Sequence, residues 1–186
     1  ITAVAMPITT QRILDSTGKP LSITRTADVW SPCGPCLALP RAALHTTLRH
    51  SLRETNVRFG ASITGLKQFG AISLVSFSDG TTGEYDLVIG ADGINSQVRQ
   101  NLFPDVRPFY TGNVCWRFIS KDIVGVESWT VMLGDGLSLL AIPIGNDQVY
   151  VYSDLAMSEL EAQRNLTDLP HSALLAAFSA PLSPLI

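Results

Sequence analysis

Hydrophobic residues follow three successive patterns in the first half of the chain. Over 40–54 the leucines fall at every fourth position on one stripe, and a proline opens the range, so the pattern predicts a helix. Over 57–63 apolar residues alternate with small or polar ones, which is typical of a half-buried strand. A second strand is predicted over 71–77, where a Ser-Asp-Gly-Thr turn closes it. Before these, the first 30 residues read as extended pieces around a turn at 15–18.

The apolar run at 87–89 shows no alternation. A short continuous run of this kind is typical of a strand covered on both faces, as in a parallel sheet under helices. Gly90 and Gly93 follow it, and glycine lets the backbone approach another group closely or take a positive φ. A helix can begin near Ser96. The segment therefore predicts a buried strand, a tight turn and the start of a helix.

Short alternating runs separated by glycine-rich turns fill the second half of the chain. Strands at this spacing form an antiparallel meander. The runs cover 114–119, 128–133, 137–142 and 148–153. A Ser-Glu-Leu-Glu sequence at 158–161 has the spacing of a helix capping box, and a last helix is predicted over 171–178.

These patterns predict a mixed α/β chain with two domains. We expect residues 1–105 to form an α/β domain with inserted strands, and residues 106–186 to form an antiparallel sheet followed by helices. The chain does not begin with methionine, which suggests a piece of a longer protein.

Composition and charge exclude several classes of protein. Hydrophobic residues make up 46% of the 186 residues and charged residues 16%, so the chain is not disordered. The 13 Lys and Arg against 16 Asp and Glu give a net charge of −3, and no basic stripe is present to bind nucleic acid. Apolar stretches are far shorter than the roughly 20 residues that cross a bilayer. Three cysteines form no disulfide framework for a secreted protein, so we expect a cytoplasmic location.

Asp92 is the residue that points most clearly to a binding site. It follows the predicted strand at 87–89, and open α/β sheets place ligands at the carboxyl ends of their strands. Its carboxylate can accept hydrogen bonds from ligand hydroxyls, and the start of the following helix offers free N–H groups to an anion. Ser96 and Arg99 add a hydroxyl and a guanidinium. The plainer alternative is a turn between strand and helix in which Ser96 is only a cap.

As a whole, the stretch 86–99 resembles a fingerprint of the FAD-dependent aromatic hydroxylases, the family of salicylate and p-hydroxybenzoate hydroxylase. The fingerprint is an apolar strand followed by G-x-D-G-x-x-S-x-V-R. Its positions are matched by Gly90, Asp92, Gly93, Ser96, Val98 and Arg99. In the family this aspartate binds the ribityl chain of FAD, and the segment lies near the pyrophosphates of FAD and NAD(P)H. The resemblance implies these cofactor-binding roles for Asp92 and its neighbours.

Two further stretches resemble the same family. Residues 39–48 are similar to its R-x-x-L-x-x-x-L helix, whose arginine reaches the flavin and corresponds to Arg41. Residues 110–117 are similar to the start of its substrate-domain sheet, which makes Arg117 and Trp116 candidates for substrate contacts, Arg117 for a substrate that bears a carboxylate. Pocket-lining residues are sought among the large residues of the sheet, although most such residues are ordinary core. These are Trp116, Trp129, Met132, Leu139 and Tyr150.

The resemblance implies a fold and an activity. The fold is a partial FAD-binding doubly wound domain followed by an antiparallel-sheet substrate domain. The activity is that of an FAD-dependent monooxygenase that hydroxylates a small aromatic molecule with NAD(P)H and O2. The family's opening G-x-G-x-x-G and later G-D-x-x-H strings do not occur in these residues. We therefore expect the middle of a longer enzyme, inactive by itself, whose sheet a complementing chain or a homo-oligomer would restore.

Two other functions remain open from the sequence. A non-catalytic α/β ligand-binding or interaction domain would keep the sheet but lack the cofactor. The Cys33-Gly34-Pro35-Cys36 motif is that of a dithiol redox module, in which the first thiol begins a helix. No metal-ligand set and no catalytic acid–base pair is expected. The aromatic substrate and the choice between NADH and NADPH are not determined.

Overall fold

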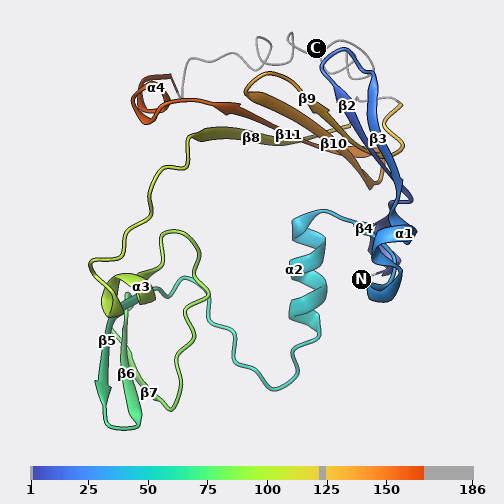
Figure 1. Cartoon of the computed structure of the whole chain (residues 1–186). Coiled ribbons are helices and arrows are strands. Elements are labelled where there is room, and N and C mark those ends of the chain that lie inside the picture. Colours follow the sequence, from blue (N-terminus) through green and yellow to red (C-terminus); the bar gives the residue numbers. More distant parts are fainter. Residues whose placement is uncertain (1, 122–124, 166–186) are drawn as a thin grey trace. The chain divides into compact units, whose positions relative to one another are not determined.

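The computed structural model describes residues 2–121 and 125–165, and the chain divides into two compact units. The first unit joins Ile1–Arg53 with Thr111–Ile186, and the second is Glu54–Tyr110. Figure 1 labels most of the elements of both units. The mixed α/β class expected from the sequence is confirmed. No helix in the described ranges is long and apolar enough to span a membrane.

A six-stranded sheet forms most of the first unit, in the order β3-β2-β9-β10-β11-β8. Neighbouring strands are antiparallel except for β2 and β9, which run parallel. The strands are β2 (Thr10–Asp15), β3 (Pro20–Arg25), β8 (Asn113–Ser120), β9 (Trp129–Leu133), β10 (Leu137–Gly145) and β11 (Gln148–Ala156). The predicted meander is confirmed in β8–β11. Its β10–β11 turn has positive φ at Asn146 and Asp147, which matches the right-handed twist of a hairpin.

The core of this unit lies on one face of the six-stranded sheet. Its buried residues come from four strands, β2 included. They are Leu14, Met132, Leu139, Ala141, Val149 and Val151. The division into units thus differs from the boundary expected near residue 105. The strands β2 and β9 are far apart in the sequence but pair in the structure. The first 53 residues therefore belong to the same unit as the strands β8–β11.

Short elements complete the first unit. They are η1 (Thr2–Val4), β1 (Met6–Pro7), α1 (Thr26–Trp30), η2 (Ser31–Cys33), β4 (Leu37–Ala38), α2 (Arg41–His50) and α4 (Glu159–Asn165). Helix α2 confirms the helix predicted over 40–54 but is shorter, since Pro40 is its N-cap and the helix ends at His50. The capping box before α4 is present, with Ser158 and Glu161 bonded reciprocally. The helix predicted over 171–178 lies outside the described residues.

The second unit contains a three-stranded antiparallel sheet and one helix. The elements are β5 (Ile63–Phe69), β6 (Ile72–Phe77), β7 (Thr82–Tyr85) and α3 (Gln97–Leu102). The strand predicted over 71–77 is confirmed, and the strand predicted over 57–63 is wrong. The observed strand instead begins at Ile63, and the Phe59 side chain is 71% exposed. Hairpin pairing with β6 starts at Ile63, so earlier residues have no strand beside them among those described.

The strand predicted over 87–89 is also wrong. This segment is irregular, and the side chains of Leu87 and Ile89 are 74% and 77% exposed. A strand forms only where a neighbour accepts and donates its backbone hydrogen bonds, and no described strand pairs with these residues. A continuous apolar run therefore did not suffice to make a covered strand here.

Candidate functional site

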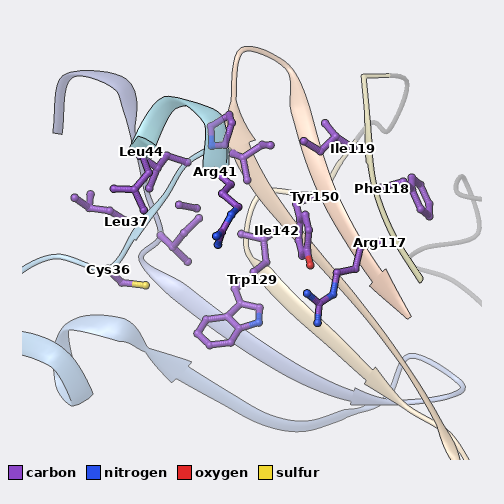
Figure 2. Close-up of a pocket in the computed structure, with 15 residues that line it drawn as sticks. Cys36, Leu37, Arg41, Leu44, Arg117, Phe118, Ile119, Trp129, Ile142 and Tyr150 are labelled. Carbon is purple, nitrogen blue, oxygen red and sulfur yellow. The ribbon is translucent and has the colours of Figure 1, made fainter. Parts of the chain in front are cut away.

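A pocket of about 830 Å³ opens within the first unit (Figure 2). One wall comes from β4 and the start of α2, and the other from β8–β11. Its lining is mainly aliphatic and aromatic, with two arginines. The lining residues are Ile8, Cys36, Leu37, Ala38, Leu39, Pro40, Arg41, Leu44, Arg117, Phe118, Ile119, Trp129, Ile142, Ile144 and Tyr150.

The sheet register places several of the pocket residues on the face opposite the core. Ile119, Tyr150 and Ile142 lie directly across from one another in β8, β11 and β10, so their side chains share a face. Val149 and Val151, which flank Tyr150 in β11, point the other way into the core. One sheet therefore supplies a packed core on one face and a ligand-sized pocket on the other.

Trp129 forms part of the pocket wall and is supported from behind. Its ring stacks on that of Trp30 in α1, with centroids 5.8 Å apart and planes 4° from parallel. Its indole Nε1 is buried and has no hydrogen-bond partner among the described residues. The stack leaves Trp129 a flat apolar surface in the pocket, which suits contact with an aromatic ring.

Arg41 and Arg117 bring two positive charges to this apolar pocket. Arg41 is the first residue of α2, and Arg117 lies in the middle of β8. No carboxylate lines the pocket. Among the described residues the one ion pair joins Arg58 to Asp79 in the other unit, so neither pocket arginine is neutralised by an acid. Both guanidinium groups are therefore available to an anionic ligand.

Sequence reasoning selected the pocket residues only in part. Trp129 and Tyr150 line the pocket, whereas Met132 and Leu139 lie in the core. Trp116 does not line it, because it lies directly opposite Ser153, a residue buried on the core face. The wall from β4 and α2 went unnoticed apart from Arg41. The apolar stretch at 37–39, just before the helix, is the sequence feature that could have indicated this wall.

The Asp92 segment lies in the second unit, where its carboxylate binds the start of α3. Asp92 accepts a hydrogen bond from the Ser96 hydroxyl at 2.5 Å and another from the backbone N–H of Gln97 at 2.6 Å. The Val98 N–H donates to it at 3.3 Å. The Ser96 hydroxyl foremost, with these N–H groups, holds the pKa of Asp92 below its ordinary value. The carboxylate is exposed, so it stays ionised and accessible.

Two glycines shape the turn that carries Asp92. A Cβ on Gly90 would lie 2.8 Å from Val98, so only glycine fits beside that buried side chain. Gly93 has φ +79, a conformation that glycine adopts without strain. Beyond them, Arg99 donates to the Ile94 carbonyl at 2.7 Å, and its buried Nε has no partner among the described residues. The fingerprint residues thus form one folded turn.

The turn presents a carboxylate that can accept hydrogen bonds from ligand hydroxyls. Asp92 keeps free acceptor positions on its exposed side after capping the helix. Ser96 is buried, and its hydroxyl is used twice, donating to Asp92 and accepting from the Arg99 N–H at 2.9 Å. The Ser96 hydroxyl thus holds Asp92 and the start of α3 together. Ser96 caps the helix, as the plainer interpretation of the sequence expected. The exposed side of the Asp92 carboxylate can still accept hydrogen bonds from a ligand.

The dithiol motif lacks the geometry of a redox module. Cys33 ends the short helix η2, and α2 begins only at Arg41, so neither cysteine stands at the start of a helix. Burial raises the pKa of the Cys36 thiol, which opposes formation of a nucleophilic thiolate. Within the described ranges, no group of three His, Cys, Asp or Glu residues can hold a metal ion.

Known proteins resemble this chain in sequence and in structure. No model of a protein family matches it. The 2-heptyl-3-hydroxy-4(1H)-quinolone synthase of Pseudomonas aeruginosa is 35% identical over 133 residues, which cover 68% of this chain and 34% of that protein. The aurachin C monooxygenase/isomerase of Stigmatella aurantiaca is 28% identical over 166 residues, 86% of this chain and 42% of that protein.

A solved structure shows the same fold. HpxO of Klebsiella pneumoniae complexed with FAD has a TM-score of 0.80 and 23% identity, over 99% of this chain and 50% of that one. The same protein has been solved with FAD and uric acid. The chain spans between a third and a half of the length of these proteins. By its likeness to the sequence relatives, the chain belongs to the family of FAD-dependent aromatic hydroxylases.

Proposed function

We propose that this chain is part of an FAD-dependent monooxygenase that hydroxylates a small aromatic molecule with NAD(P)H and O2. The observation that carries the proposal is the pocket in the first unit, which combines a stacked tryptophan, an apolar lining and two arginines without a carboxylate partner. A flat ring fits against Trp129, and an acidic oxygen on that ring is attracted by Arg117 and Arg41. The substrate class is thus an aromatic compound with an acidic group.

The apolar wall has a second role in this reaction. Leu37, Leu44 and Ile142 give the pocket an apolar wall, and a ring bound against this wall would displace water and so strengthen the attraction between the arginines and an anion. Relatives named for 2-heptyl-3-hydroxy-4(1H)-quinolone and aurachin C support a cyclic substrate. Because the pocket is much larger than one ring, it has room for a ring with an apolar substituent.

Asp92 is the residue we assign to FAD in the second unit. When bound, FAD supplies the oxygen-transfer chemistry, and the chain's residues bind and orient it. Asp92 would accept hydrogen bonds from ribityl hydroxyls, while Gly90, Gly93, Ser96 and Arg99 hold the turn in shape. We assign Arg41 to the flavin side of the pocket on the family resemblance, and Arg117 to the substrate.

Flavin retention tests the assignment of Asp92. We expect Asp92→Ala to purify with less flavin per protein than wild type, measured by visible flavin absorbance. Ser96→Ala is the control, because it removes a different cap of α3, the bond from the Arg99 N–H, and leaves the carboxylate in place. Flavin at the wild-type ratio in Asp92→Ala, or an equal loss in both variants, would show that Asp92 serves only the helix.

Binding of an aromatic anion tests the pocket. Salicylate and its neutral amide, salicylamide, are titrated against tryptophan fluorescence, which Trp129 supplies from the pocket wall. Arg117→Gln should weaken the binding of salicylate by roughly tenfold to a hundredfold, since hydrogen bonds to charged groups contribute about 1.5–3 kcal/mol. The exposed Arg25→Gln is the control. Equal loss of both ligands in Arg117→Gln would contradict recognition of charge.

A further inference from the structure

The Arg117 guanidinium lies over the ring of Tyr152. The two residues are direct partners in the β8–β11 register, so their side chains leave the same face of the sheet. The guanidinium carbon is 5.3 Å from the ring centroid, within the range of a cation–π contact. Tyr152 does not line the pocket itself, so it touches the site through Arg117.

Other charged groups nearby leave this contact intact. Asp154, two residues along β11 on the same face, accepts a hydrogen bond from Ser138 of β10. Among the described residues, no carboxylate forms an ion pair with Arg117. Burial raises the pKa of the Tyr152 phenol and Asp154 raises it further, so the phenol is neutral at neutral pH. The ring face is therefore what Tyr152 offers to the cation.

Arg117 needs such a partner because its side chain is long and exposed. An unrestrained arginine loses rotamer entropy when it is held in one place. A ring that already holds the guanidinium removes part of this cost before the ligand arrives. The ring also leaves the N–H donors at the edge of the guanidinium plane free for an anion.

We propose that Tyr152 is a positioning residue, whose ring holds the Arg117 guanidinium at the pocket in readiness for the acidic group of the substrate. The inference rests on the proposed function of the pocket. It gives a role to a residue outside the pocket wall. The position of Arg117 should depend on the aromatic ring of Tyr152 and not on its hydroxyl group. A purely structural Tyr152 would instead act by filling space on the sheet.

The first test needs no ligand. The Nε–H signal of Arg117 in NMR spectra, assigned by its loss in Arg117→Gln, should be displaced by the ring current of Tyr152. Tyr152→Phe keeps the ring and should keep the displacement. Tyr152→Leu keeps apolar bulk and should lose it. An unchanged signal in the leucine variant would overturn the proposal.

The second test measures binding of salicylate and salicylamide in the same variants. Tyr152→Leu should weaken salicylate by about two- to fivefold and leave salicylamide unchanged, while Tyr152→Phe should bind both as wild type does. In an Arg117→Gln background, Tyr152→Leu should have no further effect. Equal weakening of both ligands, or an undiminished effect without Arg117, would show a structural role and overturn the inference.

The two tests separate this inference from the proposed function. If wild type binds neither ligand while the Arg117 signal still depends on the Tyr152 ring, the positioning contact stands and the substrate class is wrong. If salicylate binds through Arg117 but Tyr152→Leu binds it as tightly as wild type, the substrate class stands and the positioning role is wrong.

Discussion

The two units of the chain differ in how they use their apolar residues. In the first, the sheet buries a continuous core, with Leu14, Met132 and Val151 fully buried. In the second, Val75 and Val98 are the buried aliphatic residues among those described, and many large apolar side chains are exposed. The exposed set includes Val57, Phe59, Phe69, Leu87, Ile89, Ile94, Phe103, Val106 and Phe109.

This difference means that the pocket and the Asp92 turn are stabilised in different ways. The pocket stands on the outer face of a sheet whose other face is packed, so its walls rest on a rigid base. The Asp92 turn rests instead on local hydrogen bonds and on the contact between Gly90 and Val98.

Core truncation should separate the two units most clearly. Leu139→Ala removes a side chain that is 1% exposed and should lower the free energy of unfolding by about 2–5 kcal/mol. Leu87→Ala, in the second unit, should change it by less than about 0.5 kcal/mol because the side chain is exposed. Chemical denaturation measures both. A comparable cost for Leu87→Ala would mean that a further segment or second copy covers this run in solution.

Gly90→Ala should distort the Asp92 turn. The added Cβ would lie 2.8 Å from Val98, and such overpacking costs about 1–3 kcal/mol. Gly65→Ala is the matched control, since its Cβ would lie 3.6 Å from Ser76 at an ordinary contact distance. Denaturation together with NMR shifts of α3 reports the effect. A Gly90 variant as stable as the Gly65 variant would show that the turn relaxes freely.

Loss of the helix cap should affect a second group in one unit but not in the other. Ser158→Ala and Ser96→Ala each remove an N-cap hydroxyl and should cost about 1 kcal/mol. Ser96 also donates to Asp92, so its loss should raise the pKa of Asp92 toward the ordinary value. Carboxyl NMR titration reads that pKa. No movement of it in Ser96→Ala would contradict the role of this hydroxyl.

The smallest expected effect concerns the turn aspartates at the surface of each unit. Hydrogen bonds from Thr81 first, with Arg58 adding to them, lower the pKa of Asp79 to about 2. The folded pKa lies below the ordinary 3.8, so this stabilisation is complete above that pH and is lost as pH falls toward 2. Thr81→Val should raise the Asp79 pKa in an NMR titration. Thr17→Val should do the same at Asp15 in the first unit.

Local pattern predicted the parts of the fold that form between neighbours in sequence. The meander of β8–β11, the helix after Pro40 and the capping box at Ser158 all depend on residues close together in the chain. The pairing of β2 with β9 joins distant segments and leaves no local signal, so the grouping of the first 53 residues with this sheet was not predicted. The strands predicted over 57–63 and 87–89 did not form, because a strand needs a neighbouring strand for its backbone hydrogen bonds and none of the described strands pairs with these segments as predicted.

The candidate site divides in the same way. The sequence by itself was enough to find the Asp92 fingerprint, the arginine that begins α2 and the alternation along β8. Each of these features depends on residue types within one short stretch of the chain. Only the tertiary structure decided which face of the sheet became core. That choice put Arg117 and Tyr150 at the pocket, sent Met132 and Leu139 inside, and set Tyr152 beneath the arginine, since burial depends on what packs against each face.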